Sequence, residues 1–159
     1  MKLLDHYHAK STRDHDYLYN LNLCSIGKSL FLLDDHSCTK FLKQCNDNQY
    51  PNQRLFRGNL SLLALYYEAV EEYEISEKYS SFGINQEQGN PDLTGLPLLY
   101  IHRGVANYRL NRKQYLQDFQ IGLSLAIATR KEFLYRAGEK YITEDLSIDL
   151  SSIFFTSNQ

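Results

Sequence analysis

Residues that break helices are few in this chain, and they gather in two places. The 159 residues include three prolines and eight glycines. Breakers concentrate in "NDNQYPNQ" (46–53) and "SFGINQEQGNPDLTGLP" (81–97). The long uninterrupted stretches favour helices over many short strands. We therefore predict an all-α chain in three blocks, within a single domain that covers residues 1–159.

Each block has the apolar spacing of amphipathic helices. In the first, Leu21, Ile26 and Leu30 recur at intervals near four and five residues, and Ser37 is a suitable N-cap for a second helix. We expect antiparallel helical hairpins at about 17–46, 54–80 and 98–128, with C-terminal helices at about 129–155 capped by Thr129 and Thr143. The hairpins would stack as a short superhelix or a compact bundle.

The second block leaves one choice open. No Gly, Pro or Asn lies between Asn59 and Tyr79. The block is therefore compatible with one long helix or with two.

Two stretches echo each other, "LFRGNLSLLALYYEAVEEYEI" (55–75) and "LYIHRGVANYRLNRKQYLQDFQIG" (99–122). Aligning Gly58 with Gly104 gives a register of 46 residues without a gap, and Tyr73 then falls on Phe119. A glycine in a first helix lets a second helix approach closely, and an aromatic ring on that second helix fills the space beside it.

These residues resemble the tetratricopeptide repeat, a pair of antiparallel helices. Gly104 matches the small position of the first helix, and Phe119 and Gly122 match the aromatic and small positions of the second. The interval from Gly104 to Phe119 is one residue shorter than the family pattern, and Asn111 replaces the turn glycine. The register of 46 residues also exceeds the family period of about 34. HEAT-like repeats, with similar periods, are the alternative.

The resemblance implies a protein-binding groove lined by the first helix of each hairpin. Its lining residues would be Ile101, Val105, Tyr108 and Arg109 in the third block, and Leu55, Asn59, Leu62 and Leu63 in the second. Mixed apolar, aromatic and arginine surfaces are typical of binding faces. The alternative is that these residues pack against the neighbouring hairpin.

Charge is unevenly distributed between the two echoing stretches. The segment "EAVEEYEISEKY" (68–79) includes Glu68, Glu71 and Glu72 among five acids, whereas residues 99–117 hold Arg103, Arg109, Arg112 and Lys113 and no acid. Opposite charges would either attract the two hairpins to each other or form docking surfaces for a partner such as a basic toxin or effector.

Several classes of function are disfavoured. A net charge of −2 excludes a generally basic nucleic-acid binder, and no segment approaches the roughly 20 apolar residues of a membrane span. The N-terminus lacks the apolar core of a signal peptide. The three cysteines, Cys24, Cys38 and Cys45, have no CxxC spacing, and we interpret them as reduced thiols of a cytoplasmic protein.

Catalytic patterns are sparse. The segment "DHYHAKSTRDHDY" (5–17) is rich in His and Asp, the residue types that bind metals, but it has no recognised ligand spacing. His36 and His102 are expected to be surface or packing residues. No cofactor and no metal are expected.

Three hypotheses follow from these patterns. The first is a non-enzymatic, protein-binding helical-repeat protein; its most specific form is an immunity protein that neutralises a toxin, and a secretion chaperone or assembly adaptor is the alternative within that class. The second is a metal-dependent hydrolase that uses the N-terminal His/Asp cluster. The third is a structural module that self-associates through Phe154 and Phe155.

Overall fold

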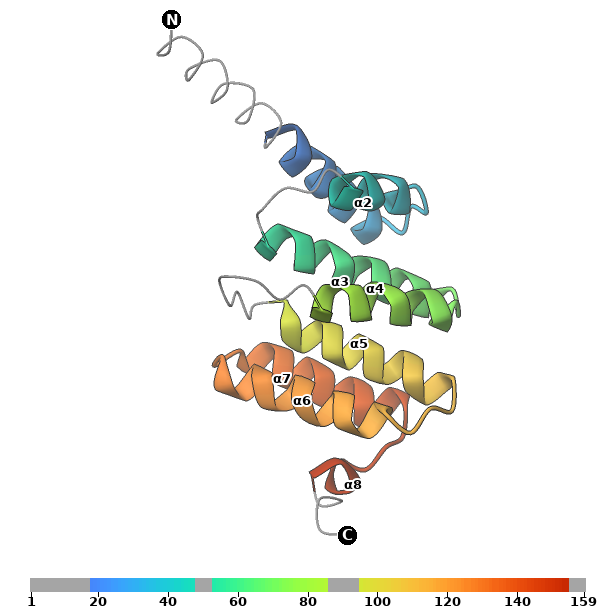
Figure 1. The fold of residues 1–159 in the computed structure, drawn as a ribbon, viewed down its shortest axis with the longest axis vertical. Helices are drawn as coiled ribbons and strands as arrows, with labels where there is room; N and C mark the ends of the chain where they lie inside the picture. Colours follow the sequence, from blue (N-terminus) through green and yellow to red (C-terminus); the bar gives the residue numbers. More distant parts are fainter. Residues whose placement is uncertain (1–17, 48–52, 86–94, 155–159) are drawn as a thin grey trace, which may run out of the picture. The chain divides into compact units, whose positions relative to one another are not determined.

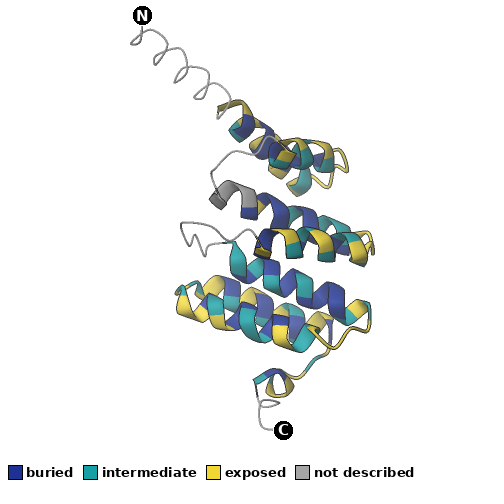
Figure 2. Ribbon diagram, in the orientation of Figure 1, coloured by how far each residue is buried: buried dark blue, intermediate teal, exposed yellow. Residues whose placement is uncertain are grey.

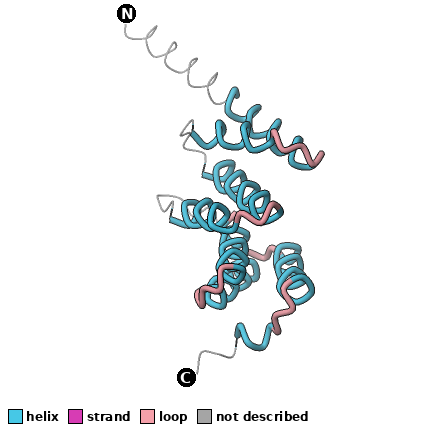
Figure 3. The backbone as a smooth tube through the Cα atoms, turned by 90° about the vertical axis from the view of Figure 1, so that its right-hand side faces the viewer, coloured by secondary structure: helices cyan, strands magenta, loops and turns pink. Residues whose placement is uncertain are grey.

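The computed structural model describes residues 18–47, 53–85 and 95–154, with the backbone alone at 53–56 (Figure 1). Within these ranges the backbone consists of helices joined by short loops, with no strand (Figure 3). The all-α prediction is confirmed. In chain order the helices are residues 18–32, α2 (Cys38–Asp47), α3 (Gln53–Ala69), α4 (Tyr73–Asn85), α5 (Leu96–Arg109), α6 (Tyr115–Ala128), α7 (Glu132–Lys140), the π-helix η1 (Tyr141–Asp145) and α8 (Leu150–Phe154).

The chain divides into two compact units, residues 1–59 and 60–159, with the division inside α3. Each unit is described below by itself. The single domain expected from the sequence stays a prediction.

The second block forms two helices, which answers the question that its sequence left open. α3 ends at Ala69 and α4 begins at Tyr73. Between them Glu71 adopts a left-handed backbone with φ 62°. The N–H of Glu71 donates to the Glu68 carbonyl at 3.0 Å, and the N–H of Glu72 donates to the Tyr67 carbonyl at 2.8 Å. This is a Schellman turn made without glycine, so no breaker residue marks it in the sequence.

The same turn ends three other helices. Asp34, Asn111 and Arg130 also have positive φ, between 55° and 57°, with the same pair of backbone hydrogen bonds around each. Glycine is the usual residue at this position, and of these three side chains asparagine tolerates the left-handed conformation most readily. The left-handed residues therefore give a structural reference point in each hairpin.

Measured from the turns at Asp34, Glu71 and Asn111, a small residue and a large residue recur at fixed positions, whereas Leu123 and Gly138 stand there around the turn at Arg130. Seven residues before Asp34, Glu71 and Asn111 stand Gly27, Ala64 and Gly104, and eight residues after them stand Leu42, Tyr79 and Phe119. A Cβ added to Gly104 would lie 2.5 Å from the Phe119 ring, and one added to Gly27 would lie 2.8 Å from Leu42. The close approach expected at Gly104 is therefore present.

Gly58 does not occupy the equivalent position. It lies thirteen residues before Glu71, is exposed, and a Cβ added to it would meet nothing within 4 Å. Glu71 and Asn111 are forty residues apart, so the turns do not follow the register of 46 residues that aligned Gly58 with Gly104.

Two of the predicted helix caps are wrong. Thr129 is the C-cap of α6, and its hydroxyl donates to the Leu125 carbonyl at 2.7 Å. The N-cap of α7 is Lys131. Thr143 lies inside η1, where its hydroxyl donates to the Glu139 carbonyl at 2.9 Å. Threonine can bond a carbonyl one turn earlier as well as cap the next helix, and the sequence alone does not distinguish the two roles.

Helix α2 begins directly after Ser37, as predicted, but the side-chain acceptor in that turn belongs to another residue. Asp35 Oδ1 accepts the backbone N–H of Ser37 at 2.8 Å. The side-chain and backbone hydrogen bonds from Ser37 hold the pKa of Asp35 below its ordinary value.

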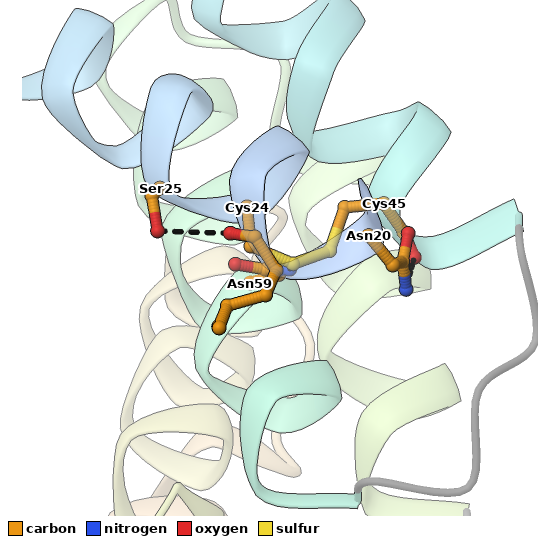
Figure 4. The surroundings of a disulfide bond; sticks show 6 residues. Asn20, Cys24, Ser25, Cys45 and Asn59 are labelled. Carbon is orange, nitrogen blue, oxygen red and sulfur yellow. Dashed lines mark hydrogen bonds between the residues drawn. A yellow bond between two sulfur atoms is a disulfide. The ribbon is translucent and has the colours of Figure 1, made fainter. Parts of the chain in front are cut away.

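A disulfide joins the two helices of the hairpin at 18–47 (Figure 4). It links Cys24 to Cys45, both buried beside Leu23, and the Asn59 amide donates to the two sulfur atoms at 2.9 and 2.6 Å. The prediction of reduced thiols is wrong for this pair, because cysteines on facing helices meet without any local motif. Cys38 alone is a free thiol, buried, and its burial raises its pKa.

The core of the second unit lies between α5, α6 and the C-terminal segment. Its buried members are Val105, Phe119, Leu123, Ile142, Leu146 and Ile153. Buried residues follow the inward faces of these helices (Figure 2). The segment after α6 therefore completes the core of this unit.

Candidate protein-binding surface

Two of the predicted groove residues on α5 are covered by the chain itself. Ile101 is 2% exposed, and a Cβ added to Gly138 of α7 would lie 2.6 Å from its side chain. Val105 is 1% exposed and belongs to the core cluster with Ile142 of η1. A partner cannot contact these two side chains while α7 and η1 are in place.

The other α5 residues lie nearer to solvent. Tyr108 is half-buried; its hydroxyl donates to the Leu146 carbonyl at 3.4 Å, and its ring packs edge-on against Tyr115. Arg109, at the end of α5, and Arg112, in the following turn, are both exposed. Of the predicted positions in this block, the two arginines are the ones that a partner can reach directly.

The predicted groove residues of α3 are also largely inside the fold. Asn59 is 5% exposed and bonds the sulfur atoms in the first unit, whereas in the second unit Leu62 is half-buried and Leu63 has no exposed surface. The side chain of Leu55 lies outside the described part of the structure.

Glu68 is buried at the centre of a polar cluster in the second unit. Its carboxylate accepts hydrogen bonds from Ser76 at 3.3 Å and from Tyr141 at 3.2 Å, and His102 Nδ1 lies 3.1 Å from Oε1. Burial, and then the charge and hydrogen bond of Glu68, raise the pKa of Tyr141. The cluster connects α3, α4, α5 and η1, so Glu68 serves the fold and His102 packs inside it.

The charge of Arg103 is likewise paired within the α5–α6 hairpin. Its guanidinium donates to Asp118 Oδ1 at 2.6 and 3.1 Å, and Asn107 donates to Oδ2 at 2.9 Å. Asp118 has no exposed surface. The sequence does not identify Asp118 and Asn107 as site residues, because Asp118 stands just outside the basic segment 99–117 and both residues meet Arg103 only when α5 and α6 pack together. The guanidinium also lies 5.1 Å from the centre of the Tyr100 ring.

Other charges of the two stretches are exposed along α4, at Glu74 and Lys78, or in the α5–α6 turn, at Lys113, and the predicted site residues that are exposed stand at the hairpin turns. Glu71 and Glu72 are exposed at the α3–α4 turn, and Arg109 and Arg112 are exposed at the α5–α6 turn. In Figure 1 the α3–α4 turn and the α5–α6 turn lie on the same side of the second unit. None of these four side chains forms an ion pair with another residue that the structure describes. We call these four residues the tip surface.

Other sequence-based hypotheses fall partly outside the structure. The N-terminal His/Asp cluster and Phe155 lie beyond the described residues, and His36 is an exposed turn residue. Within residues 18–47, 53–85 and 95–154, no three His, Cys, Asp or Glu side chains are grouped to hold a metal ion. No helix in the same ranges combines the length and apolar character needed to span a bilayer.

No model of a known protein family matches the chain, nor does any curated protein or solved structure. The tip surface is therefore interpreted from its own chemistry.

Proposed function

We propose that the chain is a non-enzymatic, protein-binding helical-repeat protein and that a partner docks on the tip surface. One observation carries the proposal. Of the charges in the two oppositely charged stretches, Glu68 and Arg103 are bonded inside the fold, whereas the tip residues are exposed without an ion partner among the described residues. Such charges add little to the stability of a fold, but they accelerate association and select partners.

The repeat character is supported by the shared turn. Three hairpins are closed at Asp34, Glu71 and Asn111 by the same backbone hydrogen bonds, with a small residue seven positions before and a large one eight positions after each. This arrangement agrees in kind with a tetratricopeptide-type helix pair, with intervals of thirty-seven and forty residues in place of the family period of about 34.

The proposed partner has two complementary patches, one basic opposite Glu71 and Glu72 and one acidic opposite Arg109 and Arg112. A basic toxin or effector meets the first requirement, so an immunity protein is the most specific form of this proposal. A secretion chaperone or assembly adaptor would use the same surface. The cytoplasmic location stays a prediction and no longer draws support from the cysteines, since Cys24 and Cys45 are joined.

Charge reversal at the tips tests this function. The tagged wild-type chain is used to capture its partner from cells of the source organism, and the identified partner is then titrated against Glu71→Lys/Glu72→Lys and against Arg109→Glu/Arg112→Glu. Each pair of substitutions is expected to weaken binding at least tenfold with an unchanged helical circular dichroism spectrum. Added salt is expected to slow association with the wild type.

The matched control reverses an exposed ion pair away from the tips. Glu132 and Arg136 pair on α7 with about three quarters of each side chain exposed, so Glu132→Lys/Arg136→Glu reverses the sign of the charge at two exposed positions, keeps the net charge and leaves the tip surface untouched. Affinity within twofold of wild type for both tip variants would reject the proposal.

A further inference from the structure

The helix at 18–32 carries an apolar surface that no other described residue of the first unit covers. Its buried side holds Leu23 and Cys24 against α2, where Phe41 packs. Five further large apolar side chains on this helix and the adjoining turn are solvent-exposed: Leu18 (55%), Tyr19 (61%), Ile26 (43%), Leu32 (73%) and Leu33 (76%). Soluble chains seldom leave so much apolar surface together on one element unless something binds it.

The exposed residues have a regular spacing. Tyr19, Ile26 and Leu33 are separated by seven residues, which is two helical turns, so they form one stripe along the helix. Leu18 and Leu32 lie about 80° and 120° to one side of this stripe, and the exposed polar residues Asn22, Ser25 and Ser29 lie among them. The single charged side chain between residues 18 and 33 is Lys28, about 200° around the helix from Ile26.

We propose that a second copy of this chain covers the stripe, with the two helices antiparallel and a two-fold axis at Ile26. The stripe is symmetric about that residue, so Tyr19 of each copy would lie against Leu33 of the other, and Ile26 against its own equivalent. A two-fold interface requires such a self-complementary patch. A partner recognised through charge would find nothing to pair with on this stripe, because none of its side chains is charged.

The available area suits a weak pair. The three stripe side chains expose roughly 350 Å² per copy, and Leu18 and Leu32 beside the stripe bring this to roughly 500–600 Å². Pairing would therefore bury between about 700 and 1,200 Å² in total, the size of a weak, transient interface. We therefore expect a dimer that dissociates on dilution. None of these five residues belongs to the tip surface, and none is among the residues that the sequence suggested for self-association, Phe154 and Phe155.

Sedimentation equilibrium of the full chain tests the pairing. The wild type is expected to shift from monomer to dimer as its concentration rises through the micromolar range, and Ile26→Asp is expected to weaken dimerisation at least tenfold. Lys28→Asp, which places the same charge on the far side of the helix, should dimerise as the wild type does. If Ile26→Asp perturbs the circular dichroism spectrum, Tyr19→Lys, at a more exposed position, replaces it.

Cysteine cross-linking tests the orientation. Cys24 and Cys45 are already joined and Cys38 is buried, so a cysteine added at position 19 or 33 is an accessible thiol. Under mild oxidation, mixed Tyr19→Cys and Leu33→Cys chains should cross-link to each other more than to themselves. A monomer at about 100 μM, a dimer unaffected by Ile26→Asp, or cross-linking only between like chains would overturn the proposal.

Discussion

The Arg103–Asp118 pair is the clearest case of a charge that serves the fold of the second unit. Asp118 is fully buried, and just 13% of the Arg103 side chain is exposed. Removing water from two charges is expensive, so such a pair contributes little net stability while it is intact. Removing one member leaves the other buried without compensation, and that is where the cost appears.

The single substitution Arg103→Met is therefore expected to lower the free energy of unfolding by about 3 kcal/mol. The double variant Arg103→Met/Asp118→Leu should cost less than the sum of the two single changes, because no uncompensated charge remains. Urea denaturation measures all three. Arg136→Met, in the exposed pair on α7, is the control and should cost about 0.5 kcal/mol or less. Strict additivity in the cycle would contradict this account.

Tyr141 makes the stability of the second unit depend on alkaline pH. Its raised pKa means that the folded state keeps the phenol protonated, whereas the unfolded chain releases the proton near its ordinary pKa of 10.0. Since the folded-state pKa is the higher one, this contribution to stability is complete below pH 10 and is lost as the pH rises above it.

At neutral pH, Tyr141→Phe should lower the free energy of unfolding by about 1–2 kcal/mol, through loss of a hydrogen bond to a carboxylate. The difference from wild type should stay constant up to about pH 9 and shrink towards pH 11, as measured by urea denaturation across this range. Other alkaline titrations affect both chains and cancel in the difference. A difference independent of pH would show that the Tyr141 phenol titrates alike in both states.

At the scale of the helical hairpin, Gly58 and Gly104 have different surroundings although the sequence aligns them. Gly104 allows Phe119 to pack closely, whereas Gly58 has no close neighbour. Gly104→Ala would drive a methyl group into Phe119, at 2.5 Å, and is expected to destabilise the chain by about 1–3 kcal/mol. Gly58→Ala meets no atom within 4 Å, so it should stabilise α3 by about 0.5–1 kcal/mol through helix propensity. Thermal unfolding of both variants checks the prediction, and shifts of the same sign would contradict it.

The helices and hairpins could be predicted because they depend on apolar periodicity and on where breakers lie. The α3–α4 turn could not, since Glu71 holds a left-handed conformation that its residue type does not indicate. The candidate site shows a similar limit. Ile101 and Val105 share a helix face with Arg109, but the later α7 and η1 cover the first two, and such coverage is a tertiary contact that the sequence of α5 does not encode.

At the scale of the whole molecule, the two units are stabilised by different means. The first has the Cys24–Cys45 disulfide and a small apolar cluster, whereas the second has a larger core with the buried Glu68 and Asp118 clusters. A disulfide stabilises mainly by restricting the unfolded chain, and its effect grows with the length of the loop it closes. Its removal should therefore act on the first unit.

Reduction of this disulfide, whose cysteines are 21 residues apart, is expected to destabilise the first unit by about 3 kcal/mol. Hydrogen exchange followed by mass spectrometry should then show lost protection in peptides from residues 18–47 and unchanged protection in peptides from residues 96–154. The variant Cys24→Ser/Cys45→Ser should match the reduced chain and be insensitive to reductant, while Cys38→Ser should still respond to it. Equal loss of protection along the whole chain would mean that the two units unfold as one, because only then does a constraint in the first unit set the stability of the second.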